Sequence, residues 1–256
     1  MQELLSLTLN LISPMRCSLF LGSIISLWIV TGILKEKQQL CESDSRKINH
    51  IAVFVGGALV FGWLPETAAR ANLHTVATII LMLIITTCCY PNIKPFSYIY
   101  AANARASDAP HTTFFFLFSW VVSIAALAII DLLFANMVVT RMAILIVGVA
   151  DGIAEPIGKR FGRHRYAVLS FGKKPVFRSL EGSLAVWIGT VIVVLCASAH
   201  SYSPLNDAVS PVVMAIITAS VVAIVEALSP RGCDNFTLLL TAASLTNMFL
   251  PSGILQ

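Results

Sequence analysis

The chain has 256 residues, of which 57% are hydrophobic and only 12% are charged, and its net charge is +4. An ordinary soluble domain is about half apolar and about one quarter charged, so a single water-soluble core cannot bury this much apolar surface. The composition excludes an ordinary soluble enzyme and predicts an all-α, polytopic membrane protein. The six cysteines are dispersed without zinc-ligand spacing, which excludes a zinc motif.

Eight apolar runs predict a bundle of eight transmembrane helices, because roughly 20 residues cross a bilayer and each run reaches or approaches that length. They form a single integral membrane domain that includes all of residues 1–256. Within residues 1–16 the apolar stretch is too short to span, and we expect it to lie along the membrane interface. The predicted spans are 17–34, 48–64, 74–90, 112–138, 141–158, 183–200, 208–229 and 235–250.

The basic residues predict the orientation of these helices. With alternate loops on one side, loops 35–47, 91–111, 159–182 and 230–234 hold 14 of the 17 Lys and Arg residues. The positive-inside rule places those loops in the cytoplasm. Both termini are then non-cytoplasmic, because an even number of spans returns the chain to the side where it started. The net positive charge follows from this topology, and no nucleic-acid partner is expected.

The loop at residues 159–182 is more basic than topology requires, with seven Lys or Arg residues against one carboxylate, Glu181. Such a dense cluster attracts polyanions, and the candidates are anionic lipid headgroups and the phosphates of a nucleotide. Gly158, Gly162 and Gly172 would let the backbone approach such a ligand closely. The basic residues are Lys159, Arg160, Arg163, Arg165, Lys173, Lys174 and Arg178.

Carboxylates are predicted to gather at the cytoplasmic interface beside this loop. Asp151 and Glu155 lie one helical turn apart, where like charges repel, and a cation between them would turn repulsion into chelation. Mg²⁺ prefers oxygen ligands and is usually held by one or two carboxylates plus phosphate oxygens. Helix N-termini near Gly182 and Asn235 would add N–H donors for phosphate. The carboxylates of this predicted magnesium site are Asp151, Glu155, Glu181 and Asp234.

Some of these residues also have purely structural interpretations. Glu155 precedes Pro156, and an alternative is that it marks a helix end facing water. The spacing of Gly158 and Gly162 also fits a close helix contact of the GxxxG type. No glycine-lysine pair in the basic loop is followed by Ser or Thr, so any nucleotide site here is not a P-loop.

Four short motifs follow one another within residues 45–250. They are Arg46, Lys47 and His50; Asp151, Ala154, Gly158 and Gly162; RSLEGS from Arg178 to Ser183; and Glu226, Ser229, Gly232, Asp234 and Asn235. In spacing and order they resemble the membrane lipid-alcohol kinases, the family of phytol kinase, dolichol kinase and CTP-dependent diacylglycerol kinase. That family is similar in turn to the CTP:phosphatidate cytidylyltransferases. Arg178 stands where the family usually has Lys.

The resemblance implies phosphoryl transfer from a nucleoside triphosphate, with CTP as the expected donor, to the hydroxyl of a membrane isoprenoid alcohol of the phytol or polyprenol type. Phosphoryl transfer requires mainly positioning and charge neutralisation, which agrees with the predicted site. It implies Asp151, Asp234 and Glu181 as Mg²⁺ ligands and Glu155 as the acceptor of the hydroxyl proton. The residues implied to bind the nucleotide and its phosphates are Lys173, Lys174, Arg178, Ser179, Gly182, Ser183, Asn235, Arg46, Lys47 and His50.

Two other functions remain open from the sequence. A cytidylyltransferase of the phosphatidate type would use the same groups to attack the α-phosphorus of CTP and release pyrophosphate. An ion-coupled membrane transporter would use the carboxylates as a relay, but relay residues lie near mid-bilayer, whereas these are predicted near one interface. The sequence favours the kinase, as an integral protein of the bacterial inner membrane with its active site at the cytoplasmic face.

Overall fold

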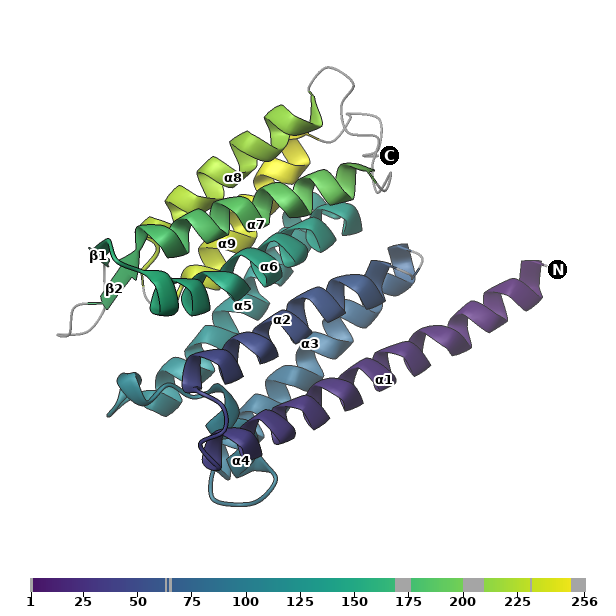
Figure 1. Ribbon diagram of the computed structural model, residues 1–256. Coiled ribbons are helices and arrows are strands. Elements are labelled where there is room, and N and C mark those ends of the chain that lie inside the picture. The colour runs from purple at the N-terminus through teal and green to yellow at the C-terminus, as the bar shows by residue number, and fades with distance from the viewer. Residues whose placement is uncertain are drawn as a thin grey trace. The chain divides into compact units, whose positions relative to one another are not determined.

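The computed structural model describes residues 2–62, 64, 66–168, 176–199, 210–230 and 232–249. The chain divides into two compact units, Met1–Trp120 and Val121–Gln256, and the division falls inside helix α5. The elements, shown in Figure 1, are α1(Gln2–Glu36), α2(Glu42–Gly62), α3(Glu66–Cys89), α4(Phe96–Asn103), the short 3₁₀ helix η1(Ala106–Asp108), α5(Thr112–Phe134), α6(Met137–Phe161), β1(Arg165–Val168), β2(Val176–Ser179), α7(Leu180–Ala199), α8(Pro211–Leu228) and α9(Asp234–Phe249).

The helices confirm the predicted all-α class, and a two-stranded hairpin is the one β element among the described residues. Each of the eight predicted runs lies mainly within one helix. Six of the described helices, with α1 counted from Ser13, are long and apolar enough to cross a bilayer. Helix α9 has only 16 residues, and α2 carries four charged residues in its first turns, so neither is in that group. The count of eight spans and the location of the termini therefore stay predictions.

Helix α6 has well-defined ends, and they differ from the predicted run of 141–158. Asn136 caps its first turn, because the side-chain oxygen accepts hydrogen bonds from the backbone N–H groups of Val138 at 2.8 Å and Val139 at 3.4 Å. Pro156 removes one helical hydrogen bond but does not end the helix, which continues to Phe161. The interpretation of Glu155 as a helix end is therefore wrong.

In the unit Met1–Trp120, helix α1 packs against α2, α3 and α4. Gly32 allows α1 to pack closely on α4, because a side chain there would overlap the backbone of Tyr98. Lys35 reaches the end of α4, and its Nζ donates to the carbonyl oxygens of Ala101 at 2.6 Å and Ala104 at 3.1 Å. The two basic loops predicted on one side of the membrane, 35–47 and 91–111, thus meet at the same end of this unit. Their membrane side stays a prediction, as does the interfacial placement of residues 1–16, which belong to α1 from Gln2 onward.

In the unit Val121–Gln256, helices α6, α7, α8 and α9 form a closed ring in which α6 packs on α7, α7 on α8, α8 on α9 and α9 on α6. Small and β-branched side chains fill its centre, including the fully buried Val147, Val186, Val222 and Ala243. Strands β1 and β2 pair antiparallel directly before α7 begins. Because β2 leads into α7, the hairpin brings the basic segment to one end of this ring.

Candidate functional site

The β1–β2 hairpin aims two polar side chains at the helix ring. In its antiparallel register Tyr166 lies opposite Arg178, so both side chains point to the same face of the hairpin. Arg165 lies opposite Ser179 and points to the other face. The sequence predicts a basic loop at residues 159–182, whereas the structure forms two strands within it. Pairing of β1 with β2 decides which of its basic side chains turns inward.

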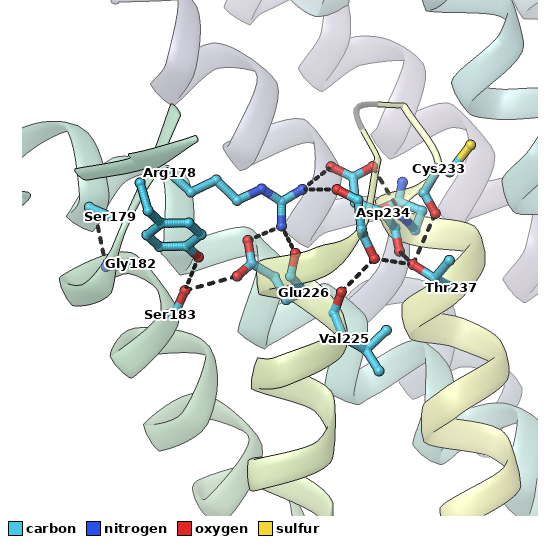
Figure 2. A network of polar contacts seen from close by, with 12 residues as sticks. Arg178, Ser179, Gly182, Ser183, Val225, Glu226, Cys233, Asp234 and Thr237 are labelled. Atoms are coloured by element: carbon cyan, nitrogen blue, oxygen red, sulfur yellow. Dashed lines mark hydrogen bonds and ion pairs between the residues drawn. The ribbon is translucent and has the colours of Figure 1, made fainter. Parts of the chain in front are cut away.

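Arg178 is the basic side chain that turns inward, and it lies at the centre of a polar cluster (Figure 2). Its side chain is only 15% exposed. The guanidinium donates from Nη1 to the Glu226 carboxylate at 2.5 Å and to the Glu226 backbone carbonyl, and from Nη2 to the Ser229 carbonyl at 3.3 Å. Both carbonyls lie at the C-terminal end of α8, where helical carbonyl oxygens lack helical partners. Arg178 therefore joins the hairpin to the end of α8.

The surrounding carboxylates determine the charge state of Arg178. Burial lowers the pKa of its guanidinium, but the negative charges of Glu226, Asp234 and Asp151 outweigh burial and raise that pKa. The Asp234 carboxylate lies 3.9 Å from Nη2, and Asp151 is a buried residue of α6. Arg178 is consequently a permanent positive charge shared by acidic residues from three helices. We call Arg178, Glu226, Asp234, Ser183 and Tyr166 the Arg178 cluster.

Glu226 extends the cluster toward α7. Its Oε2 accepts a hydrogen bond from the Ser183 hydroxyl at 3.1 Å, and that hydroxyl lies 2.7 Å from the Tyr166 hydroxyl. Burial raises the pKa of the Tyr166 phenol, so this side chain keeps its proton at neutral pH. A continuous chain of polar groups therefore runs from β1 through α7 to α8 and back to Arg178 of β2.

The start of α9 supplies the last part of the cluster. Asp234 opens the helix, and its Oδ1 accepts from the backbone N–H of Asn235 at 3.1 Å. The hydroxyl groups of Ser229 and Thr237 lie 2.5 Å apart and join the α8–α9 turn to α9. Among the described residues the side-chain oxygen of Asn235 is buried and has no hydrogen-bond partner. A buried, unpaired amide oxygen beside a carboxylate is a ready ligand for a cation or an N–H donor.

Two of the four predicted carboxylates form contacts outside the Arg178 cluster. Glu155 forms an ion pair with Lys159 at 2.8 Å, one turn further along α6. Glu181 accepts hydrogen bonds from the backbone N–H groups of Arg163 at 3.0 Å and His164 at 3.3 Å, and its carboxylate lies 2.9 Å from the His164 ring. Glu181 therefore fastens the connection between α6 and β1, on the side of α7 away from Glu226.

Three glycines allow this junction to pack closely. Ser179 caps α7 by accepting from the backbone N–H of Gly182 at 3.1 Å. A side chain at Gly158 would come within 2.8 Å of the Ser179 hydroxyl, and one at Gly162 within 2.8 Å of the Ser179 Cβ. A side chain at Gly182 would come within 3.1 Å of the Ala154 carbonyl. The close-contact interpretation of the Gly158 and Gly162 spacing is confirmed, because both glycines pack where the hairpin joins α7.

Some predicted nucleotide contacts stay predictions. Lys173 and Lys174 lie outside the described residues. Arg46, Lys47 and His50 belong to the other unit, where Lys47 is 4% exposed and His50 stacks on Phe54 with ring centroids 4.4 Å apart. Ser179, Gly182, Ser183 and Asn235 lie at the helix ends of the same unit as Arg178.

Two residues of the cluster received no role from the sequence. Glu226 belongs to the last motif, and a carboxylate inside an apolar run is in itself a signal of function. Tyr166 has no such signal, because its place opposite Arg178 depends on the hairpin register. The structure adds both residues to the candidate site.

The residues at this site supply some of the oxygen ligands that a magnesium ion needs, but not a complete set. Among the described residues no three His, Cys, Asp or Glu side chains form a group that could hold a metal by themselves. Mg²⁺ does not require such a group, because one or two carboxylates and the phosphates of its nucleotide usually suffice. Asp234, Asp151 and the unpaired oxygen of Asn235 offer only oxygen ligands, which is the set that Mg²⁺ prefers.

The sequence of this chain is similar to those of known proteins. The model of a family described as the cytidylyltransferase family matches residues 5–230 of the chain. The phytol kinase of Synechocystis sp. is 31% identical over 106 residues, which are 40% of this chain and 40% of that kinase. The alignment thus spans less than half the length of this curated relative. No solved structure matches the chain.

Proposed function

The chain belongs to the cytidylyltransferase family, and we propose that it transfers the terminal phosphoryl group of a nucleoside triphosphate to the hydroxyl of a membrane isoprenoid alcohol. CTP is the proposed donor, and an alcohol of the phytol or polyprenol type is the proposed acceptor. The observation that carries this proposal is the Arg178 cluster, where acidic and basic groups meet at one end of apolar helices. The similarity to a phytol kinase supports a kinase within this family.

The proposed nucleotide site is built on the ends of α7 and α9. Lys173 and Lys174, two basic residues of the segment 159–182, would neutralise the phosphates. Ser179, Gly182, Ser183 and Asn235 lie at helix N-termini, where N–H groups and the helix dipole favour an anion. Arg178 would contribute its charge while Glu226 holds its orientation. Arg46, Lys47 and His50 of the other unit stay predicted nucleotide contacts.

Asp151 and Asp234 are the proposed magnesium ligands, with Asn235 as a neutral oxygen ligand. A bound Mg²⁺ would neutralise charge on the transferring phosphoryl group. Glu181 is proposed as a positioning residue, because it accepts hydrogen bonds from the backbone of Arg163 and His164 and holds both in place. Glu155 lies one turn from Asp151 and is proposed to accept the proton of the lipid hydroxyl.

The reaction site would lie at a membrane surface, because Ser183 is in the first turn of α7 and Glu226 in the last turn of α8, two helices long and apolar enough to span a bilayer. A lipid alcohol could then present its hydroxyl at headgroup depth while its tail stays among the helices. This arrangement favours a water-soluble donor and a membrane-bound acceptor. The cytoplasmic face is the proposed side.

The test is incubation of the purified full-length chain with phytol or a polyprenol, Mg²⁺ and CTP labelled at the γ-phosphate. Label should appear in the lipid and should be absent from reactions of the Asp151→Asn variant. Repetition with γ-labelled ATP, GTP and UTP identifies the donor. Absence of lipid label with every donor and alcohol would contradict the proposal.

The second candidate is a CTP-dependent cytidylyltransferase acting on a phosphatidate-type lipid, which the description of the matching family favours. In that reaction a lipid phosphate oxygen attacks the α-phosphorus of CTP, and pyrophosphate leaves. CTP labelled at the α-phosphate separates the two functions. Lipid label from the α position supports the cytidylyltransferase, and lipid label from the γ position supports the kinase.

A further inference from the structure

A groove of about 270 Å³ lies between α6 and α7, on a different face of α7 from the Arg178 cluster. Its walls come from residues four apart on α6 and three or four apart on α7, so each helix contributes one face. Both helices are long and apolar enough to span a bilayer. The apolar wall residues are Ile153, Ile157 and Phe161 of α6 and Leu184, Ala185 and Ile188 of α7.

The groove is separate from the candidate active site because α7 presents different faces to the two. Ser183 and Trp187 lie four residues apart and hydrogen-bond to Glu226 and Ser220 of α8. Leu184 and Ile188 lie on the groove, and they are 57% and 45% exposed. A molecule in the groove would therefore lie outside the Arg178 cluster.

One end of the groove is polar and basic. Phe161, which ends α6, and Glu181, in the first turn of α7, mark this end. Glu181 binds the backbone of Arg163 and His164, which places the exposed side chains of both residues close to the groove end. Arg165 directly follows His164 and is also exposed. Two arginines, Arg163 and Arg165, therefore lie beside a single carboxylate, Glu181, which already accepts hydrogen bonds from the backbone.

An apolar groove between two helices long enough to span a bilayer, ending among exposed arginines, has the chemistry of a phospholipid site. Its volume is below the roughly 300–1,000 Å³ that holds a drug-sized ligand, and it suits a segment of one acyl chain. Exposed aromatic side chains accompany the arginines, since Phe161 is 67% and Phe177 is 58% exposed. Aromatic and basic side chains together are typical of the boundary between lipid tails and headgroups.

We propose that the α6–α7 groove binds an anionic phospholipid of the surrounding bilayer, with an acyl chain along the groove and the phosphate headgroup at Arg163, His164 and Arg165. The phospholipid is a bound component distinct from the reacting alcohol. It would stabilise the junction of α6, the hairpin and α7 that carries Arg178. Its recognition depends on charge at one end of the groove and on apolar fit along the rest.

Native mass spectrometry of the purified full-length chain in detergent tests this inference, with phosphatidylglycerol and phosphatidylcholine of identical acyl chains as probes. Wild type should retain phosphatidylglycerol more tightly than phosphatidylcholine. The double variant Arg163→Gln/Arg165→Gln should weaken phosphatidylglycerol binding by roughly 10- to 30-fold, because each basic side chain near anionic lipid adds to the attraction. The variant Lys37→Gln/Lys94→Gln removes two exposed charges of the other unit and should bind like wild type.

The variant Leu184→Trp tests the groove itself, since the larger side chain would fill space meant for the acyl chain. This variant should weaken the binding of both phospholipids several-fold, while its thermal unfolding temperature stays near that of wild type. Equal retention of the two phospholipids by wild type would overturn the proposal. The proposal would also be overturned if Arg163→Gln/Arg165→Gln and Lys37→Gln/Lys94→Gln weakened phosphatidylglycerol binding equally, because general surface charge would then explain the binding. Unchanged binding in Leu184→Trp would exclude the groove.

Discussion

Replacement of Arg178 by methionine gives the sharpest test of the candidate site. The change removes the guanidinium but keeps an unbranched apolar side chain of similar length. Arg178 and Glu226 have side chains only 15% and 8% exposed, and loss of one partner of a buried ion pair costs about 3–5 kcal/mol. The hydrogen bonds to two carbonyl groups at the end of α8 are lost as well. We expect Arg178→Met to lower the free energy of unfolding by about 4 kcal/mol.

The double variant Arg178→Met/Glu226→Leu separates stability from catalysis. Apolar side chains often replace a buried ion pair without loss, so this variant should recover to within about 2 kcal/mol of wild type; the Ser183 hydroxyl loses one acceptor but keeps Tyr166 as a partner. Transfer of label to lipid should stay absent in both variants, because neither restores the positive charge.

Unfolding of the full-length chain in mixed micelles with increasing dodecyl sulfate, followed by tryptophan fluorescence, measures these differences. If Arg178→Met unfolded within about 1 kcal/mol of wild type, the pair would not be buried as described. A double variant as unstable as the single one would show that Glu226 is not the main partner. Recovery of activity in the double variant would reduce Arg178 to a purely structural residue.

Three further predictions follow from the same unit. Gly162→Ala should lower the free energy of unfolding by about 1–3 kcal/mol, because the new methyl group overlaps the carbonyl oxygen of Gly158 and meets Ser179; the control Gly22→Ala in the other unit, with nothing within 4 Å, should be neutral or slightly stabilising in the same unfolding assay. Asp234→Asn should reduce lipid phosphorylation at least about 100-fold and leave unfolding near wild type, and retention of full activity would contradict its role as a ligand. Burial raises the pKa of the Tyr166 phenol, so its contribution to stability is complete below the ordinary tyrosine pKa of about 10 and is lost as pH rises through the raised folded value. Tyr166→Phe should remove that alkaline loss, and identical pH profiles of the two proteins would refute the assignment.

Local sequence determined the helices and the residues worth considering. The apolar runs predict helices because a chain in lipid must satisfy its backbone hydrogen bonds internally. Carboxylates and a dense group of basic residues at the ends of those runs were visible for the same reason, since charges are costly within apolar segments. Asp151, Arg178 and Asp234 could therefore be selected from the sequence before any contact among them was known.

Only the tertiary structure decided which charges meet. Arg178 turns inward because β1 pairs with β2. The register of that pairing depends on contacts between two strands, and the spacing of apolar residues along the chain does not predict it. Glu226 becomes its partner because α7 packs against α8. Glu155 and Glu181 look equivalent to Asp151 and Asp234 along the chain, yet they pair with Lys159 and with the α6–β1 connection. Hydropathy reports whether a residue prefers lipid or water, whereas the partner of a charge depends on distances between distant segments, which only packing sets.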